Sequence, residues 1–365
     1  MLMEKAWAKI KGSFGDINSG SPHEVLNSFS IAPCYNFSVH EELDEEDLEK
    51  TWAGLVRGAQ LNFPMVAGTN DHVNLPGLKP SHSYSLLHCQ DVVSHNKKYK
   101  VLKLRNPWGR TEYKGFASEH DTDFWNEVPA DQKEKILPKK GANDGVFTIP
   151  VDAFALNFET VDLSHLHPGY SYEFKTLWIQ SNQAAFVHLT VSDDHEAYLC
   201  LEKGFKNEKG QKRVNYGYTR MLIAYEPEQG QYEFYGGKLE TLYPDLTYEA
   251  KFKKGHYYIM LQADDPMQGG SFPATFSYYH KSVENHAMRD IEIEHKVSKN
   301  LEFSFLTDVL KNHAMRLNDD TTKLSPRKGD FVRSALLSEE GGYGYVYCTL
   351  EEDSDVRVNM TIDQE

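Results

Sequence analysis

The chain has 365 residues, of which 40% are hydrophobic, 25% charged and 12% aromatic, a composition typical of globular proteins and long enough for two or three domains. Its formal net charge of −15 argues against a nucleic-acid-binding protein, because such proteins usually present a basic face. It has no apolar run of the length that a membrane-spanning helix needs.

Helical and strand patterns alternate over the first part of the chain. Apolar residues at helical spacing predict helices over residues 1–10 and 41–58, and the polar stretch 16–33 predicts a loop between them. Strands are expected at 63–68, 83–93, 99–105, 143–149 and 160–163, with a short helix at 151–157. The strands at 83–93 and 99–105 read as a hairpin. This alternation predicts an α+β first domain.

Beyond a linker at residues 165–169, the pattern is one of successive strands. They are expected at 176–180, 185–191, 196–202, 220–225 and 256–263, separated by Gly-, Pro- and Asp-containing breaks. Such spacing is typical of an antiparallel β-sandwich. Further strand signals at 301–306 and 344–350 predict either a partial second sandwich or an extension of the first. We therefore expect three parts, residues 1–164, 165–285 and 286–365.

The cysteines carry information about the cellular compartment. Cys34, Cys89, Cys200 and Cys348 are scattered and form no CxxC pair, which argues against a zinc site or a disulfide framework. Residues 1–14 lack the apolar centre of a signal peptide. Both observations favour a reducing compartment and predict a cytoplasmic protein.

Two short segments point to catalysis. Ser-His-Ser-Tyr-Ser-Leu (81–86) places His82 at the start of one expected strand, and Leu-Arg-Asn-Pro-Trp-Gly (104–109) places Asn106 at the end of its neighbour. An Asn carbonyl can accept a hydrogen bond from a His ring and orient it, which is the supporting half of a Cys-His-Asn triad. Trp108 could shield that bond from water. A lone His is more often structural, but the Asn-Pro-Trp-Gly run favours the catalytic interpretation.

These segments resemble the calpain motifs around the catalytic histidine, typically Gly-His-Ala-Tyr-Ser, and the catalytic asparagine, Arg-Asn-Pro-Trp-Gly. Residues 2–9 and 144–147 are similar to the start and the closing strand of the second subdomain of the calpain protease core. Residues 254–259 resemble a strand of the domain that follows this core. The resemblance implies a papain-like half-core, an antiparallel sheet with helices, followed by an all-β antiparallel sandwich.

The chain also departs from the calpain pattern. The Gln-Gly-x-x-Gly-Asp-Cys-Trp segment that carries the nucleophile is absent, and Ser81 stands where the family usually has Gly. Cys34 and Cys89 lack the setting of a reactive thiol. The resemblance implies the C-terminal part of a calcium-dependent cysteine endopeptidase acting on proteins. The first subdomain of that endopeptidase, encoded upstream or separately, would supply the catalytic Cys. This polypeptide alone should therefore be inactive.

Two other functions stay open at this stage. One is a non-catalytic calpain homologue that serves as a regulatory module. The other is a β-sandwich protein that binds phospholipid in the presence of calcium, using the acidic turns at 193–196 and 264–265. Acidic residues are common in turns for conformational reasons alone, which favours a structural explanation of these turns.

The resemblance further implies a calcium ion in this subdomain. Calcium is held by carboxylate and carbonyl oxygens. The implied ligands are Glu112, either Glu119 or Asp121, Asp144, and the backbone carbonyl of Ala142. Val146 replaces an acidic residue that the family often has at that position, which weakens the expected affinity.

Overall fold

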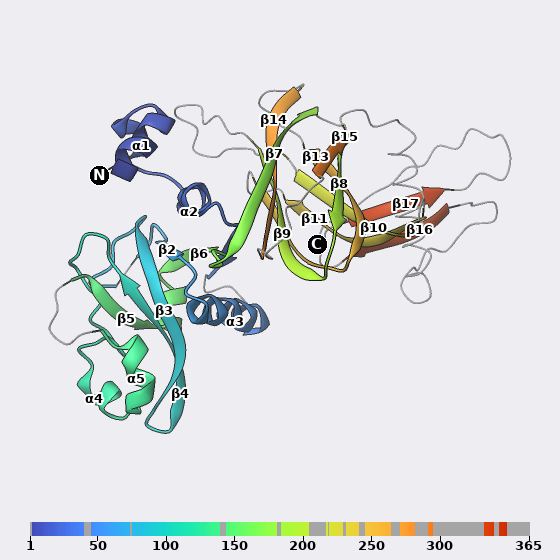
Figure 1. Ribbon diagram of the computed structural model, residues 1–365. Coiled ribbons are helices and arrows are strands. Elements are labelled where there is room, and N and C mark those ends of the chain that lie inside the picture. Colours follow the sequence, from blue (N-terminus) through green and yellow to red (C-terminus); the bar gives the residue numbers. More distant parts are fainter. Residues whose placement is uncertain are drawn as a thin grey trace. The chain divides into compact units, whose positions relative to one another are not determined.

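The computed structural model describes residues 2–39, 45–73, 75–138, 144–180, 184–203, 217, 219–228, 231–240, 245–263, 271–281, 291–294, 332–338 and 343–348. The chain forms two compact units, Met1–Tyr170 and Ser171–Glu365 (Figure 1). The first is α+β and the second is an all-β sandwich, as the sequence predicted. The finer division into three parts stays a prediction.

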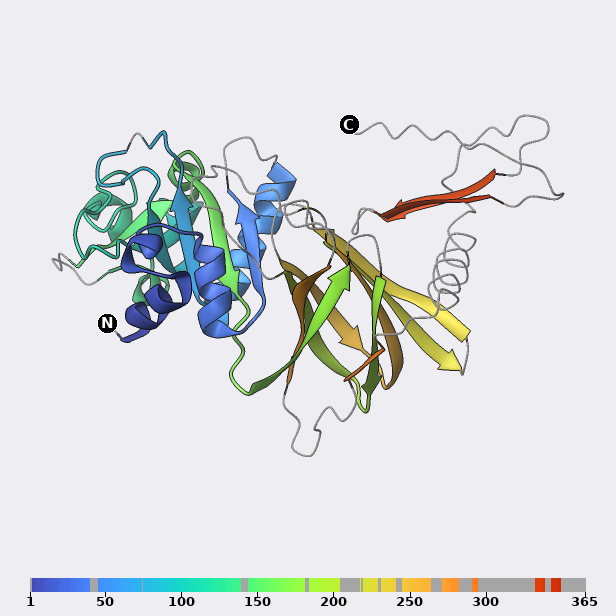
Figure 2. The ribbon, with the colours of Figure 1, turned by 90° about the horizontal axis from the view of Figure 1, so that it is seen from above.

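The first unit contains one antiparallel sheet, whose blue-to-green strands are flanked by helices (Figure 2). Its strands lie in the order β1-β6-β2-β3-β4-β5. Their bounds are Cys34–Ser38, Phe158–Ser164, Met65–Thr69, Ser83–Ser94, Lys97–Arg105 and Val146–Pro150. Helix α3 (Glu45–Gln60) buries Trp52 and Leu55 in the core under this sheet, because these apolar residues fall on one helical face.

The N-terminal part of this unit is more helical than expected. Helix α1 (Leu2–Lys11) matches the prediction, but residues 16–33 are not simply a loop. They contain part of a 3-10 helix, η1 (Phe14–Ile17), and helix α2 (Pro22–Ser30). Pro22 suits the first turn of a helix because its missing N–H has no partner there. Ile31, with a φ of 51°, ends α2. The polar composition of the segment concealed this helix.

The β3–β4 hairpin positions the residues singled out above. Its two turn residues, His95 and Asn96, have φ values of 49° and 58°, the backbone that a two-residue hairpin turn prefers. The strands pair from Ser94 opposite Lys97 to Ser85 opposite Arg105. Continued by one residue, this register places Asn106 opposite Tyr84, and His82 lies two residues before Tyr84, so the two side chains are diagonal neighbours on one face of the sheet. Short helices α4 (Thr122–Asn126) and α5 (Ala130–Ile136) lie beside this hairpin, and α6 (Val151–Ala155) follows β5 (Figure 1).

The second unit consists of two antiparallel sheets, with strand orders β11-β10-β13-β8-β15 and β12-β9-β14-β7. Leu189 and Ile259 of one sheet and Leu199 and Phe276 of the other belong to one buried core, which makes the pair a sandwich. The strands are β7 Tyr170–Gln180, β8 Ala184–Val191, β9 His195–Lys203, β10 Thr219–Glu228, β11 Gln231–Glu240, β12 Asp245–Phe252, β13 Gly255–Ala263, β14 Ser271–Lys281 and β15 Ile291–Glu294.

Strands β11, β12, β14 and β15 were not predicted from the sequence. A separate two-stranded sheet joins β16 (Val332–Ser338) and β17 (Tyr343–Cys348), the second of which overlaps the strand expected at 344–350. The strand expected at 301–306 lies outside the described residues. Within the described part of the chain, none of the helices has the length and apolarity needed to cross a bilayer.

Candidate active site

His82 and Asn106 lie side by side as diagonal neighbours at the open end of the hairpin. The Nε2 atom of His82 is 3.1 Å from Oδ1 of Asn106, and Asn106 is fully buried. An amide oxygen can only accept, so Nε2 carries the proton and Nδ1 remains an acceptor. This is the ring state in which Nδ1 can take a proton from a nucleophile.

The orientation of the Asn106 amide follows from its other contacts. The backbone N–H of Trp108 donates to Oδ1 at 3.1 Å, and Nδ2 donates to the carbonyl oxygen of Thr111 at 3.2 Å. A flipped amide would place donor against donor and acceptor against acceptor. The backbone N–H of Asn106 also donates to Gly145 O at 2.8 Å. Asn106 is therefore held on both its side chain and its backbone.

The backbone of His82 is held by Thr69, at the end of β2. The His82 N–H donates to Thr69 Oγ1 at 2.9 Å, and this hydroxyl donates to the carbonyl oxygen of Lys79 at 2.7 Å. Ser81, directly before His82, has a φ of 48°. This left-handed conformation favours glycine, which gives a physical reason for the Gly that calpains usually have there.

Two aromatic rings flank the imidazole of His82. The ring of Trp108 lies 4.5 Å from it between centroids, and the ring of Tyr84 contacts it edge-on at 4.9 Å. Tyr84 is fully buried, whereas Trp108 is 54% exposed. Trp108 therefore lies where it can shield the His82–Asn106 hydrogen bond from solvent on one side, the role that the sequence predicted for it.

The thiols described by the structure do not provide a nucleophile. Cys34, Cys89 and Cys200 are buried. Burial, reinforced by the charge of Asp91, raises the pKa of Cys89 to about 12, so this thiol stays protonated and unreactive near neutral pH. The side chain of Cys348 lies outside the described residues.

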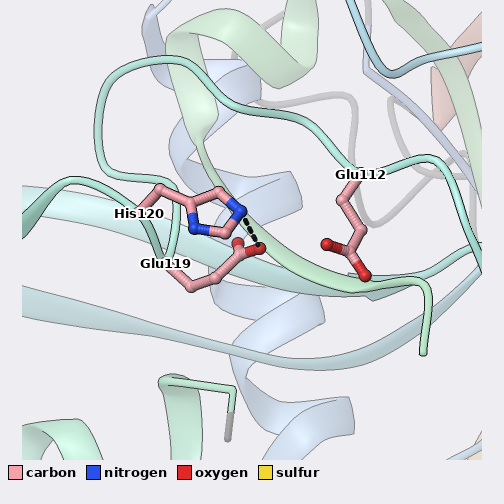
Figure 3. A group of neighbouring side chains, drawn as sticks. All are labelled: Glu112, Glu119 and His120. Atoms are coloured by element: carbon pink, nitrogen blue, oxygen red, sulfur yellow. Dashed lines mark ion pairs between the residues drawn. The ribbon is translucent and has the colours of Figure 1, made fainter. Parts of the chain in front are cut away.

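A group of metal-ligating side chains lies in the loop that follows Trp108. One ligand atom each from Glu112, Glu119 and His120 lies within 4.8 Å of the others (Figure 3). Glu112 is buried, and its Oε1 accepts from the backbone N–H of Gly145 at 2.9 Å. His120 Nε2 lies 3.2 Å from Glu119 Oε1. Sequence reasoning did not single out His120, whose only signal was its adjacency to Glu119.

The structure distinguishes the two carboxylates between which the sequence could not choose. Asp121 is the N-cap of α4, and its two oxygens accept from the backbone N–H groups of Phe124 and Ala117 at 3.1 and 3.0 Å. Glu119, in contrast, faces Glu112. Asp144 is not a member of this group and accepts from its neighbour Val146 N at 3.1 Å. Ala142, the fourth implied ligand, lies outside the described residues.

Glu119 has the environment of a cation ligand. Its side chain is only 6% exposed. Burial raises the pKa of its carboxyl, and the charge of Glu112 acts in the same direction, while its own backbone amide, His120 and the amide of Thr148 oppose the rise. Neither carboxylate oxygen makes a hydrogen bond of normal geometry. A bound cation would satisfy both buried carboxylates, although calcium usually takes six to eight oxygen ligands.

The first 165 residues match the family model described as "Calpain family cysteine protease". Residues 1–165 of this chain are therefore similar in sequence to the calpain protease family. The chain is 28% identical to mouse calpain-9 over 170 residues, covering 46% of this chain and 24% of that protein. Human calpain-14 is 31% identical over 234 residues, which cover 63% of this chain and 31% of that protein. Rat calpain-1 catalytic subunit is 25% identical over 170 residues, which cover 46% of this chain and 23% of that protein.

The chain thus spans about a quarter to a third of the length of these relatives. Among solved structures, a Yersinia pseudotuberculosis-derived mitogen aligns with a TM-score of 0.23 and 13% identity, over 35% of this chain and 97% of that one. That likeness is too weak to support an argument about the fold.

The acidic turn of the sandwich has a structural explanation. Asp194 Oδ1 accepts from the backbone N–H of Lys254 at 2.8 Å, in the turn between β12 and β13. Glu196 forms an ion pair with Lys251 at 3.4 Å. These contacts connect β9 to the neighbouring strands. The second acidic turn expected from the sequence, at residues 264–265, lies outside the described residues.

Proposed function

We propose that this chain carries the histidine–asparagine half of the active site of a calpain-like, calcium-dependent cysteine endopeptidase. The His82–Asn106 hydrogen bond, with its orientation set by Trp108 N and Thr111 O, supports this proposal most directly. In the reaction, His82 Nδ1 takes the proton of a cysteine thiol, and the thiolate attacks the peptide carbonyl carbon. His82 then protonates the leaving amine and later activates the water that hydrolyses the thioester.

The nucleophile in this proposal comes from a segment outside these 365 residues. Two observations support that source. The described thiols are buried, with Cys89 held protonated by a pKa of about 12, and the curated relatives are several times longer than the matched region. On its own, the chain would bind and orient a substrate poorly and would not cleave it.

Calcium is the cofactor that we propose for this enzyme. Glu112 and Glu119 would hold the ion, with Asp144 and the backbone carbonyl of Ala142 as further oxygen ligands. When bound, the ion supplies positive charge that stabilises the two buried carboxylates. The ion would hold Glu112 in place. Glu112 accepts a hydrogen bond from Gly145 N, and Gly145 O accepts one from Asn106 N. The ion would therefore also help to hold Asn106 in position.

Protein substrates are the partners that the proposal requires. The described acidic residues of the sandwich turn are engaged within the protein, so they lend no support to phospholipid binding with calcium. A cytoplasmic location fits the scattered cysteines of the chain, which show no pattern of a disulfide framework.

A chimera tests the proposal. The Cys-bearing first subdomain of human calpain-14 would be fused in front of residue 1, and casein cleavage measured with and without calcium. We expect calcium-dependent cleavage that a thiol-directed inhibitor blocks and that His82→Ala lowers by about 10²-fold or more. The control, His72→Ala, changes a histidine whose side chain is 88% exposed and should leave the rate unchanged.

A folded chimera whose thiol reacts with the inhibitor, yet which cleaves nothing, would contradict the proposal. So would cleavage that survives His82→Ala. The first result would favour the regulatory-module alternative, and the second would show that His82 is not the catalytic base.

A further inference from the structure

We infer that Glu112, Glu119 and His120 form a site for a divalent transition-metal ion of the zinc type, distinct in ligand chemistry from a calcium site. Imidazole is a good ligand for zinc, whereas calcium prefers oxygen. The inference concerns metal binding by this chain's own residues and does not depend on proteolysis. It shares two carboxylates with the proposed calcium site, so the two ions would compete.

The geometry of the Glu119–His120 pair carries the inference. Two ligands about 2.0–2.1 Å from a tetrahedral zinc ion lie about 3.3 Å apart. The observed separation between Glu119 Oε1 and His120 Nε2 is 3.2 Å. Figure 3 shows both side chains facing Glu112, whose nearest ligand atom lies within 4.8 Å of theirs. A small side-chain movement of Glu112 would complete a three-ligand site with a fourth position for water.

The carboxylate of Glu119 is buried without a hydrogen bond of normal geometry. Its side chain is only 6% exposed, and its Oε1 has the His120 ring beside it, yet neither carboxylate oxygen makes such a hydrogen bond among the described residues. A buried carboxylate left in this state is costly, and a cation removes the cost. Glu112 is already positioned by Gly145 N through one oxygen, which leaves its other oxygen for an ion.

His120 supplies the route of entry. Its side chain is 50% exposed, so an ion can reach the imidazole from solvent and then pass to the buried carboxylates. No other group of three such side chains this close together occurs in the part of the chain that the structure describes.

The test is isothermal titration calorimetry on the chelator-treated full chain, with ZnCl₂ and CaCl₂ in separate titrations. The variants are His120→Asn and Glu119→Gln. His72→Asn is the matched control, because His72 Nε2 lies 3.1 Å from Asp71 on the surface and reproduces the His–carboxylate pair without a buried third ligand. Circular dichroism and urea midpoints check that every variant folds. The chain has 16 histidines, so the informative quantity is the difference between each variant and the wild type.

We expect His120→Asn to remove one zinc equivalent or to weaken it at least about tenfold, since even changes to residues that merely hold metal ligands cost about 10–100-fold. Calcium binding should be unaffected by His120→Asn, and Glu119→Gln should weaken both ions. A His120→Asn variant that titrates with zinc like the wild type would overturn the inference, as would an equal loss in His72→Asn. Absence of calcium binding alone would refute the calcium proposal and leave the zinc site standing.

Discussion

Replacing Asn106 with alanine should destabilise the first unit by about 2–4 kcal/mol. The change removes three hydrogen bonds, those with His82 Nε2, Trp108 N and Thr111 O, at 3.1, 3.1 and 3.2 Å. A buried polar group that loses its partner costs about 1–3 kcal/mol. The total stays below three times that value because the contributions of groups in one hydrogen-bond network are not additive. The cavity left by the amide adds to the loss.

Urea denaturation followed by tryptophan fluorescence measures this loss. Four of the five tryptophans lie in the first unit, and the fifth, Trp178, is 64% exposed, so the signal reports mainly on that unit. The midpoint should fall by about 1 M or more. The control is Asn126→Ala, an exposed asparagine at the end of α4, which should change stability by less than about 0.5 kcal/mol.

Nuclear magnetic resonance gives a second readout for the same variant. Long-range ¹H–¹⁵N spectra of the imidazole should show His82 protonated at Nε2 in the wild type and a mixture of tautomers in Asn106→Ala, because the acceptor is gone. If Asn106→Ala matched Asn126→Ala in stability and left the His82 spectrum unchanged, the conclusion that Asn106 orients His82 would be wrong.

Three further predictions concern the first unit and use the same denaturation assay. Burial, with His167 and Arg57 acting in the same direction, lowers the pKa of His165 to about 3 from an ordinary 6.5. Between pH 6.5 and pH 3 the imidazole of His165 is therefore protonated in the unfolded chain but not in the folded one. The contribution of the neutral His165 to the free energy of unfolding is fully present above pH 6.5, and up to about 2 kcal/mol of it is lost by pH 5. His165→Gln should reduce this pH dependence. If the free energy of unfolding changed with pH as steeply as in the wild type, His165 would not be its cause. Gly145→Ala should lower the free energy of unfolding by about 1–3 kcal/mol, because the φ of Gly145 is +82° and the new Cβ would lie 2.7 Å from the backbone oxygen of Asn106. The control is Gly20→Ala, whose Cβ would meet nothing within 4 Å. Equal losses in the two variants would contradict this reasoning. Phe158→Ala, at a fully buried position, should cost about 3–5 kcal/mol, and a loss no larger than that of the exposed control Leu156→Ala would show that the core is mis-assigned.

Local patterns in the sequence predicted much of the first unit. Helical spacing indicated α1 and α3, and alternation with a short polar turn indicated the β3–β4 hairpin. The neighbourhood of His82 and Asn106 follows in part from that hairpin, because the two residues are diagonal neighbours at its open end. Contacts with Thr69 of β2 also hold the backbone of His82. Such inferences succeed where the deciding contacts lie within a short stretch of chain. Helix α2 was missed because its polar residues resemble a loop. Strands β12 and β14 were missed because both pair with β9, which is distant in sequence. Strand β11 was also missed, although its partner is the adjacent strand β10.

The choice between Glu119 and Asp121 shows what the sequence by itself left undecided. Both are acidic, lie two residues apart and suit a cation equally well by composition. Only the tertiary structure shows that Asp121 uses its oxygens to cap α4, while the Glu119 carboxylate is buried against Glu112 and beside His120. The sequence by itself determined α1, α3 and the β3–β4 hairpin, whose contacts are local, and its motifs singled out His82 and Asn106. Which carboxylates are available to a cation was decided by packing, because this depends on which backbone N–H groups the fold brings to them.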